Sequence, residues 1–140
     1  MLALEVISVA VSDIDRSLEF YTKNVGFGLD VDYRPTPSFR VVQLTPPGSA
    51  CSIHLIKSGD AGRIRNLTLV TTDLVTERDR LLKSGVNVEK IRHKTPLATW
   101  AGEWADGVDP ERHDYASFAN FLDPDGNEWT LQERGFQSIY

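Results

Sequence analysis

The sequence has a single cysteine, Cys51, and this scarcity excludes several kinds of structural and metal site. One cysteine cannot form an internal disulfide, and it excludes a metal site built from several cysteines. No apolar stretch approaches the length of a membrane-spanning helix. Residues 1–12 also lack the charged start and the long apolar stretch of a secretion signal. We therefore expect a cytoplasmic protein with no membrane partner.

Basic residues are few and scattered. The chain has 15 Lys and Arg against 20 Asp and Glu, which gives a formal net charge of −5. This acidity, with a pI near 5.1, argues against nucleic acid as a partner. A length of 140 residues with 41% hydrophobic content is sufficient for one globular domain with its own core, and we predict a single domain over residues 1–140.

The first part of the chain predicts a strand, a helix and three further strands. Residues 4–11 alternate between apolar and smaller or polar side chains, which is typical of a half-buried strand. Ser12 and Asp15 have the spacing of a helix capping box, and the helix should end at Gly26. Further strands are expected at about residues 28–33, 39–45 and 51–57.

The same pattern then begins again. Asp13-Ile14 and Asp73-Leu74 are 60 residues apart, and the second helix should end near Ser84-Gly85. Strands are expected at about residues 66–72, 87–92, 115–122 and 127–133. This is an internal repeat of a βαβββ module, with module one at about 3–57 and module two at about 65–133. Residues 94–114 form a long connection of a kind that is usually functional or mobile.

One module alone is too small to bury its apolar face. We therefore predict an α+β fold in which the two βαβββ modules form one curved, cup-shaped mixed sheet of eight strands flanked by helices. Alternation along the strands sends one set of side chains under the helices: Ile7, Val9, Leu67, Leu69, Trp129 and Leu131. The opposite set should line the cup: Val6, Ser8, Ala10, Asn66, Thr68, Thr130 and Gln132.

A turn near the C-terminus joins the last two predicted strands. In Asp123-Pro124-Asp125-Gly126-Asn127, proline presets the backbone for a turn, and glycine and asparagine tolerate positive φ. The two aspartates resemble a catalytic carboxylate pair, but their role as turn formers is the stronger interpretation. The sequence therefore predicts a β-hairpin here.

Several motifs together resemble one known family. They are Val11 to Tyr21, Val25-Gly26-Phe27, Thr72-Asp73-Leu74, Ser84-Gly85-Val86 and Phe121 to Asn127. Over about residues 3–133 the chain resembles the vicinal oxygen chelate superfamily, which includes glyoxalase I, bleomycin-resistance proteins and extradiol dioxygenases, and most closely its glyoxalase-like branch. The resemblance implies a homodimer, but it leaves the function open because this fold hosts several chemistries.

The resemblance also implies where a metal would bind. Enzymes of this superfamily hold a divalent metal with His, Gln or Glu, and the matching positions here are Val6, Asn66 and Thr130. Valine has no lone pair, and Asn and Thr are weak neutral ligands. A one-residue slip would offer Glu5 with Glu128 or Gln132, but a slip turns every side chain to the other face. We predict no metal and no other cofactor, with a non-standard site of His54 and His113 or Glu103 as the alternative.

Candidate site residues follow from the cup-facing positions and from the long connection. His54 is the candidate general base. Trp100 and Trp104 could cover an aromatic ligand, anchor their loop, or contact a second subunit. The predicted ligand-binding set is Ser8, Phe39, Gln43, Ser52, His54, Asn66, Thr68, Trp100, Trp104, Tyr115, Thr130 and Gln132.

These residues support more than one function. The first hypothesis is metal-independent binding of an aromatic or cationic metabolite or drug in the cup. The alternative is an enzyme: a glyoxalase-type lyase, isomerase or dioxygenase that uses a metal or His54 as base. A third hypothesis is a module whose dimer surface is its functional part. The sequence specifies neither the ligand nor whether there is turnover.

Overall fold

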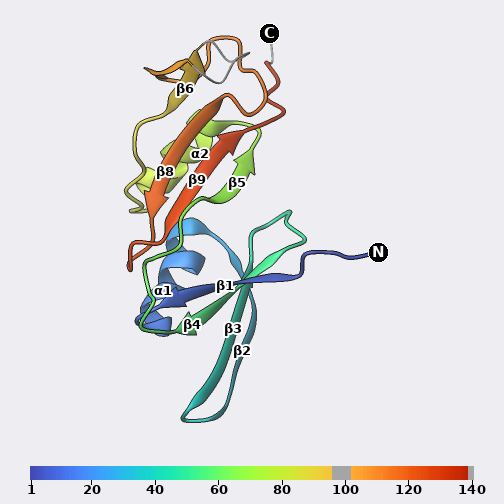
Figure 1. Ribbon diagram of the computed structural model, residues 1–140, viewed down its shortest axis with the longest axis vertical. Helices are drawn as coiled ribbons and strands as arrows, with labels where there is room; N and C mark the ends of the chain where they lie inside the picture. The colour runs from blue at the N-terminus through green and yellow to red at the C-terminus, as the bar shows by residue number, and fades with distance from the viewer. Residues whose placement is uncertain (96–101, 139–140) are drawn as a thin grey trace. The chain divides into compact units, whose positions relative to one another are not determined.

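The computed structural model describes residues 1–95 and 102–138, and within them the chain forms two compact units (Figure 1). The first comprises residues 1–64 together with the turn at 123–127. The second comprises residues 65–122 and 128–140. Each unit corresponds to one of the two predicted modules, except that the turn at 123–127 of module two belongs to the first unit. That the modules make a single domain stays a prediction.

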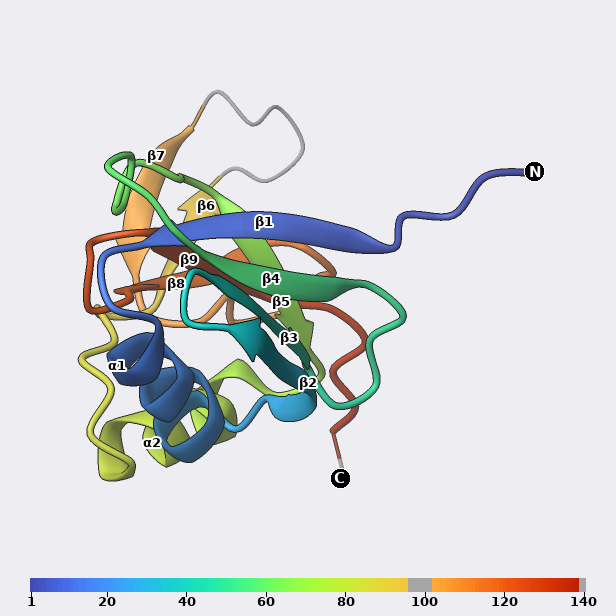
Figure 2. The ribbon, with the colours of Figure 1, turned by 90° about the horizontal axis from the view of Figure 1, so that it is seen from below.

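The first unit has a four-stranded mixed sheet and one helical segment. Its elements are β1 (Val6–Val11), α1 (Ile14–Glu19), a π-helical continuation η1 (Phe20–Val25), β2 (Gly28–Thr36), β3 (Phe39–Thr45) and β4 (Ser52–Lys57). The strand order is β1-β4-β3-β2. β1 runs parallel to β4, which lies beside it in Figure 2, and the other pairs are antiparallel.

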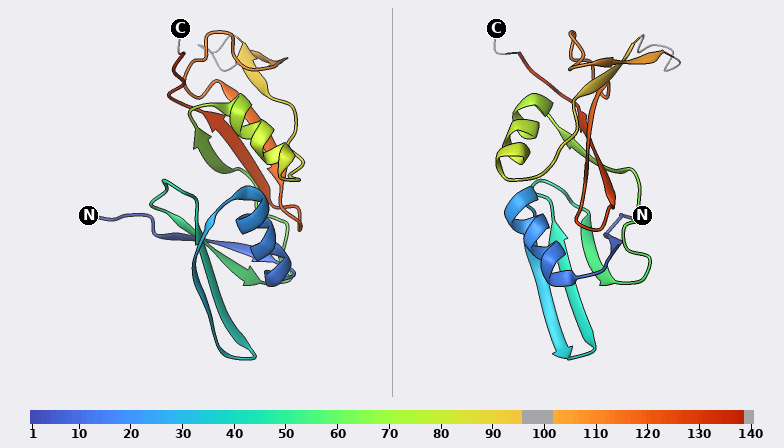
Figure 3. Two further views of the ribbon diagram at one scale, coloured as in Figure 1. Left: turned by 180° about the vertical axis from the view of Figure 1, so that it is seen from behind. Right: turned by 90° about the vertical axis from the view of Figure 1, so that its left-hand side faces the viewer.

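The second unit repeats this plan with one additional strand. Its elements are β5 (Leu67–Thr71), α2 (Leu74–Lys83), β6 (Arg92–Thr95), β7 (Glu103–Asp106), β8 (Ser117–Leu122) and β9 (Glu128–Glu133). The strand order is β5-β9-β8-β6-β7, and β5 runs parallel to β9. Helix α2 lies over β8 and β9 on one face of this sheet (Figure 3).

The predicted α+β class with two βαβββ-like modules is confirmed. The strands of the described residues form two hydrogen-bonded sheets, one for each module, where we expected one sheet of eight strands. In both sheets, each strand forms its hydrogen bonds with strands of the same module. The predicted strand at 87–92 begins only at Arg92, and Val88 makes an isolated bridge to Phe121. Part of the long connection is itself a strand, β7, paired with β6.

The predicted apolar faces contribute to the two cores in part: Val9, Trp129 and Leu131 are buried, whereas Ile7, Leu67 and Leu69 are half-buried. In the first unit Val9, Val11 and Leu55 are fully buried, as is Tyr21 of η1. In the second unit the buried set is Ala119, Phe121, Trp129 and Leu131 from the sheet with Leu74 and Leu81 from α2. The rings of Phe121 and Trp129 stack with their centroids 6.1 Å apart. Burial of these side chains leaves the opposite sheet faces for polar groups.

Both helices begin at an aspartate N-cap. The side chains of Asp13 and Asp73 accept hydrogen bonds from the backbone N–H groups of Arg16 and Thr76, each at 3.1 Å. The predicted capping role of Ser12 is therefore wrong. Its backbone N–H donates to Asp125 instead, at 3.1 Å. None of the helices within the described ranges is long and apolar enough to cross a membrane.

The N-cap of α2 makes stability depend on pH. The backbone hydrogen bond from Thr76 holds the pKa of Asp73 below its usual value, and burial opposes this shift. The cap therefore stabilises fully above the unfolded pKa of about 3.9, and this contribution is lost as the pH falls through the lower folded pKa. We expect Asp73→Ala to cost about 1 kcal/mol at pH 7 and less at pH 3. Asp73→Asn should keep most of the cap without the pH dependence. Denaturant unfolding at both pH values tests this, and an equal cost of Asp73→Ala at both would contradict it.

The turn at 123–127 is tied into the first unit. Buried Asp123 accepts hydrogen bonds from the Tyr21 hydroxyl at 2.7 Å and from the backbone N–H groups of Asp125 and Asn127, each at 2.9 Å. The side chain of Asn127 donates to the Ala10 carbonyl at 2.9 Å. Asp123 and Asn127 therefore both have structural roles, as the turn interpretation predicts.

Candidate functional site

The open face of the second sheet carries the most developed candidate site. Strand pairing places Arg92 opposite Phe118, Lys94 opposite Trp104, and Asn120 opposite Thr130. Residues opposite each other on neighbouring strands share a face, so these side chains form one continuous surface. It lies opposite the face that carries Trp129 and Leu131.

A pocket of about 490 Å³ opens on this face. Its lining residues are Asn66, Glu89, Arg92, Lys94, Trp104, Phe118, Asn120, Glu128 and Thr130. A volume of this size suits a small organic molecule. The pocket therefore combines an aromatic wall, two basic groups, two acidic groups and several neutral polar groups.

The aromatic wall consists of Trp104 and Phe118. Their rings meet edge to face, with centroids 5.2 Å apart. The Arg92 guanidinium lies 4.5 Å from the centroid of the Trp104 ring, and the Lys94 ammonium lies 4.3 Å from it. These cation–π contacts help to hold an indole that is still 45% exposed. The indole is therefore partly exposed at the pocket wall, while two cations lie against its ring.

A hydrogen-bonded relay crosses the floor of the pocket. Arg92 donates from a terminal guanidinium nitrogen to Asn120 Oδ1 at 2.6 Å. Asn120 Nδ2 in turn donates to Thr130 Oγ1 at 2.8 Å, and more weakly to the Trp129 carbonyl at 3.3 Å. Asn120 and Thr130 are each only 8% exposed. The relay therefore fixes polar groups at the base of the pocket.

The three positions at which the resemblance implies metal ligands do not offer a suitable donor set. Val6 has no donor atom, and Thr130 already accepts a hydrogen bond from Asn120, which contacts the Arg92 cation. Asn66 has a left-handed backbone (φ 62°) and precedes β5. A cation beside a neutral hydroxyl disfavours a divalent metal. Residues 1–95 and 102–138 also contain no cluster of three His, Cys, Asp or Glu side chains able to hold one.

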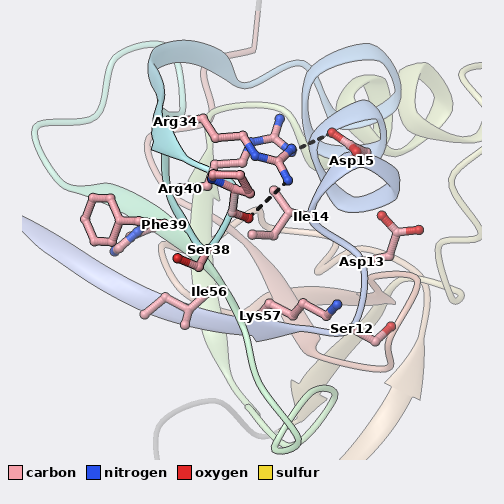
Figure 4. A pocket seen from close by; sticks show the side chains of 12 residues that line it. Ser12, Asp13, Ile14, Asp15, Arg34, Ser38, Phe39, Arg40, Ile56 and Lys57 are labelled. Carbon is pink, nitrogen blue, oxygen red and sulfur yellow. Dashed lines mark hydrogen bonds and ion pairs between the residues drawn. The ribbon is translucent and has the colours of Figure 1, made fainter.

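The first unit has a separate pocket of about 580 Å³ (Figure 4). It is lined by Ser12, Asp13, Ile14, Asp15, Arg34, Pro37, Ser38, Phe39, Arg40, His54, Ile56 and Lys57. Arg40 donates to Asp15 at 2.7 Å and to both carboxylate oxygens of Asp32 at 3.0 Å. These bonds raise the pKa of Arg40 and hold the pKa of Asp32 below its usual value. Arg40 is thus committed to structural ion pairs.

The histidines give limited support to catalysis. His54 lines the first-unit pocket, but no acidic side chain among the described residues hydrogen-bonds it, so its role as general base stays a prediction. His113 Nδ1 lies 2.7 Å from Asp109, and His113 Nε2 lies 3.4 Å from Glu111. Glu103 lies on β7. The described residues contain no cluster of three His, Cys, Asp or Glu side chains that would support the alternative metal site of His54 with His113 or Glu103.

The predicted ligand-binding residues fall into several groups. The second-unit pocket brings together Asn66, Trp104 and Thr130, and the first-unit pocket contains Phe39 and His54. The remaining described residues of the set line neither pocket: Ser8, Gln43, Ser52, Thr68, Tyr115 and Gln132. Trp100 lies outside the described residues. Their roles in binding stay predictions.

Sequence reasoning missed Arg92, Lys94 and Asn120. The alternation of Arg92 and Lys94 is a signal for one strand face, but the strand was expected to end at residue 92 instead of beginning there. Asn120 lies in the correctly predicted strand β8, and its importance depends on neighbours that are distant in the sequence. Trp104 was predicted as a ligand-binding residue, but the strand β7 that positions its indole was not predicted.

Comparison with known proteins identifies the family. A model of the Glyoxalase/Bleomycin resistance protein/Dioxygenase superfamily matches residues 3–131, and the chain belongs to this superfamily. None of the curated proteins matches the chain.

Solved structures show similar folds. TnmS3, an antibiotic binding protein from Streptomyces sp. CB03234, is 29% identical with a TM-score of 0.70, over 95% of this chain and 96% of TnmS3. A glyoxalase/bleomycin resistance protein from the same organism is 30% identical with a TM-score of 0.67, over 93% of this chain and 99% of its own. UcmS2 shares the fold at 20% identity and a TM-score of 0.71, over 94% of this chain and 98% of UcmS2. The predicted homodimer stays a prediction.

Proposed function

We propose that this protein binds a planar aromatic small molecule, such as an antibiotic or a related metabolite, in the second-unit pocket and without a metal. The observation that carries the proposal is the half-exposed Trp104 indole, held by Arg92 and Lys94 at the wall of a pocket of about 490 Å³. TnmS3, which binds an antibiotic and is 29% identical over nearly the whole chain, gives independent support.

The charges of the pocket narrow the predicted ligand. The sequence alone predicts either an aromatic or a cationic ligand. In the structure, however, two basic side chains already lie over the Trp104 ring. A cationic ligand that stacked there would be repelled by both. Glu89 and Glu128 balance the formal charge of the pocket. We therefore favour a neutral or electron-rich aromatic ligand.

Calorimetric titration with planar three-ring aromatics tests the proposal. We expect micromolar binding to the wild-type protein, unchanged after dialysis against a chelator because no metal takes part. Trp104→Ala should weaken binding about tenfold, since the lost stacking surface is worth roughly 1–1.5 kcal/mol. Tyr33→Ala is the matched control, because Tyr33 is 58% exposed and lies on β2 of the other unit.

Two results would contradict the proposal. One is the absence of binding by the whole panel at about 100 μM, a concentration at which even a weak specific pocket is substantially filled. The other is an equal loss of affinity in Trp104→Ala and Tyr33→Ala. Loss of binding on chelation would contradict its metal-independent part.

A further inference from the structure

The relay from Arg92 to Thr130 has a fixed direction. Arginine has only donors, so the Asn120 atom that contacts it at 2.6 Å must be the amide oxygen. The amide nitrogen of Asn120 then faces Thr130 Oγ1 at 2.8 Å and donates to it. The Trp129 carbonyl, also a pure acceptor, lies 3.3 Å from the same nitrogen and supports this orientation.

This direction determines what Thr130 presents to the pocket. Its hydroxyl oxygen accepts from Asn120, which leaves the hydroxyl proton to be donated elsewhere. Within residues 1–95 and 102–138, Thr130 has no acceptor for that proton, although the residue is only 8% exposed and lines the pocket. An unused donor in a nearly dry position is costly unless a ligand or water accepts from it.

We infer that the pocket recognises an acceptor oxygen, a carbonyl or phenolate oxygen on the aromatic ligand, through the Thr130 hydroxyl, with Asn120 as the positioning residue. The inference rests on the proposed function and adds the chemical class of the ligand. Arg92 strengthens the donor, because its charge polarises the amide that binds Thr130. Its guanidinium N–H groups also favour an electron-rich oxygen beside the aromatic wall.

Three planar probes of nearly equal shape separate this inference from simple aromatic binding. Fluorenone carries a carbonyl acceptor, carbazole carries an N–H donor, and fluorene carries neither. Calorimetric dissociation constants for the wild-type protein should rank fluorenone about 5- to 10-fold tighter than fluorene, the value of one well-placed hydrogen bond. Carbazole should bind no better than fluorene.

Variants of the relay then assign the preference to its residues. Thr130→Val should bring fluorenone to the affinity of fluorene, and Thr130→Ser should restore the difference. Asn120→Asp turns the relay around, because its carboxylate accepts from both Arg92 and Thr130. The Thr130 oxygen would then face the pocket as an acceptor, and carbazole should become the preferred probe. Thr22→Val, which alters a hydroxyl bonded to the Leu18 carbonyl in the other unit, is the control.

Each outcome decides the inference. Equal binding of fluorenone and fluorene by the wild-type protein overturns it and leaves the proposed function standing, whereas failure of all three probes overturns both. Thermal melts report whether each variant folds. If Asn120→Asp does not fold, the comparison of Thr130→Val with Thr130→Ser decides: a fluorenone preference that survives in Thr130→Val is the overturning result.

Discussion

Replacing Arg112 by methionine should lower the free energy of unfolding by about 3–5 kcal/mol, which is the usual cost of removing one partner from a buried ion pair. The guanidinium donates to both carboxylate oxygens of Glu133, at 2.7 and 2.6 Å. Glu133 is fully buried, and Arg112 is mostly covered. The Glu133 carboxylate lies away from solvent, so removal of Arg112 would leave a buried charge without its partner.

The position of Glu133 explains why the chain keeps this pair. Its carboxylate also accepts the backbone N–H of Leu74 at 2.9 Å, in the first turn of α2. A negative charge there is favourable because helix N-termini carry unsatisfied N–H groups and a partial positive charge. The hydrogen bonds between Arg112 and Glu133 raise the pKa of Arg112. One glutamate thus joins β9, α2 and the 107–116 loop within the second unit.

Chemical denaturation with matched variants checks this prediction. The double variant Arg112→Met/Glu133→Met should recover part of the lost stability, because no buried charge is then left alone. Lys23→Met removes an exposed pair with Glu19, at 3.6 Å, and should change stability by less than about 0.5 kcal/mol.

A defect of Arg112→Met below about 1 kcal/mol would contradict this account of the pair.

The second large effect is expected at Gly62, where alanine should cost about 3 kcal/mol. The backbone of Gly62 is left-handed (φ 83°), and an added methyl carbon would lie 2.0 Å from the carbonyl oxygen of Asp125. The left-handed conformation alone costs a non-glycine residue roughly 1–2 kcal/mol, and the overlap forces a backbone shift worth roughly 1–3 kcal/mol more. Packing of the 123–127 turn within the first unit therefore requires glycine here.

Two other glycines separate these contributions. Gly48 has a similar φ of 85° but no atom near its would-be methyl group, so Gly48→Ala should show the backbone cost alone. Gly59 has neither a positive φ nor a near neighbour, so Gly59→Ala should be neutral or slightly stabilising. Unfolding free energies of the three variants give the test. A cost at Gly62 equal to that at Gly48 would show that the contact with Asp125 does not matter.

Features encoded within a few residues could be read from the sequence. The alternation that buries Val9, Trp129 and Leu131 has a period of two, and the structure buries these three side chains as predicted. The glycine at the end of the first helical segment is equally local, and Gly26 ends it with a φ of 98°. The repeat is visible because the same local patterns recur 60 residues later. These signals were sufficient for the α+β fold and for the superfamily that the family match establishes.

Local signals were insufficient where the partner is distant. Ser12 has the composition and spacing of a helix cap, but the structure pairs it with Asp125, 113 residues away, and gives the cap to Asp13. The division into two sheets was likewise missed, because alternation fixes which face is buried and not which strand lies alongside.

The candidate site shows the same division between sequence and structure. From the sequence, the resemblance to this superfamily predicted that Thr130 stands where its metal enzymes would carry a ligand, and residue order placed the aromatic Trp104 in a long connection. Only the tertiary structure placed Arg92 against Asn120, 28 residues away, and Asn120 against Thr130. Hydrogen-bond direction depends on which groups meet across strands, and for that reason the donor at Thr130 could not be predicted from residue order.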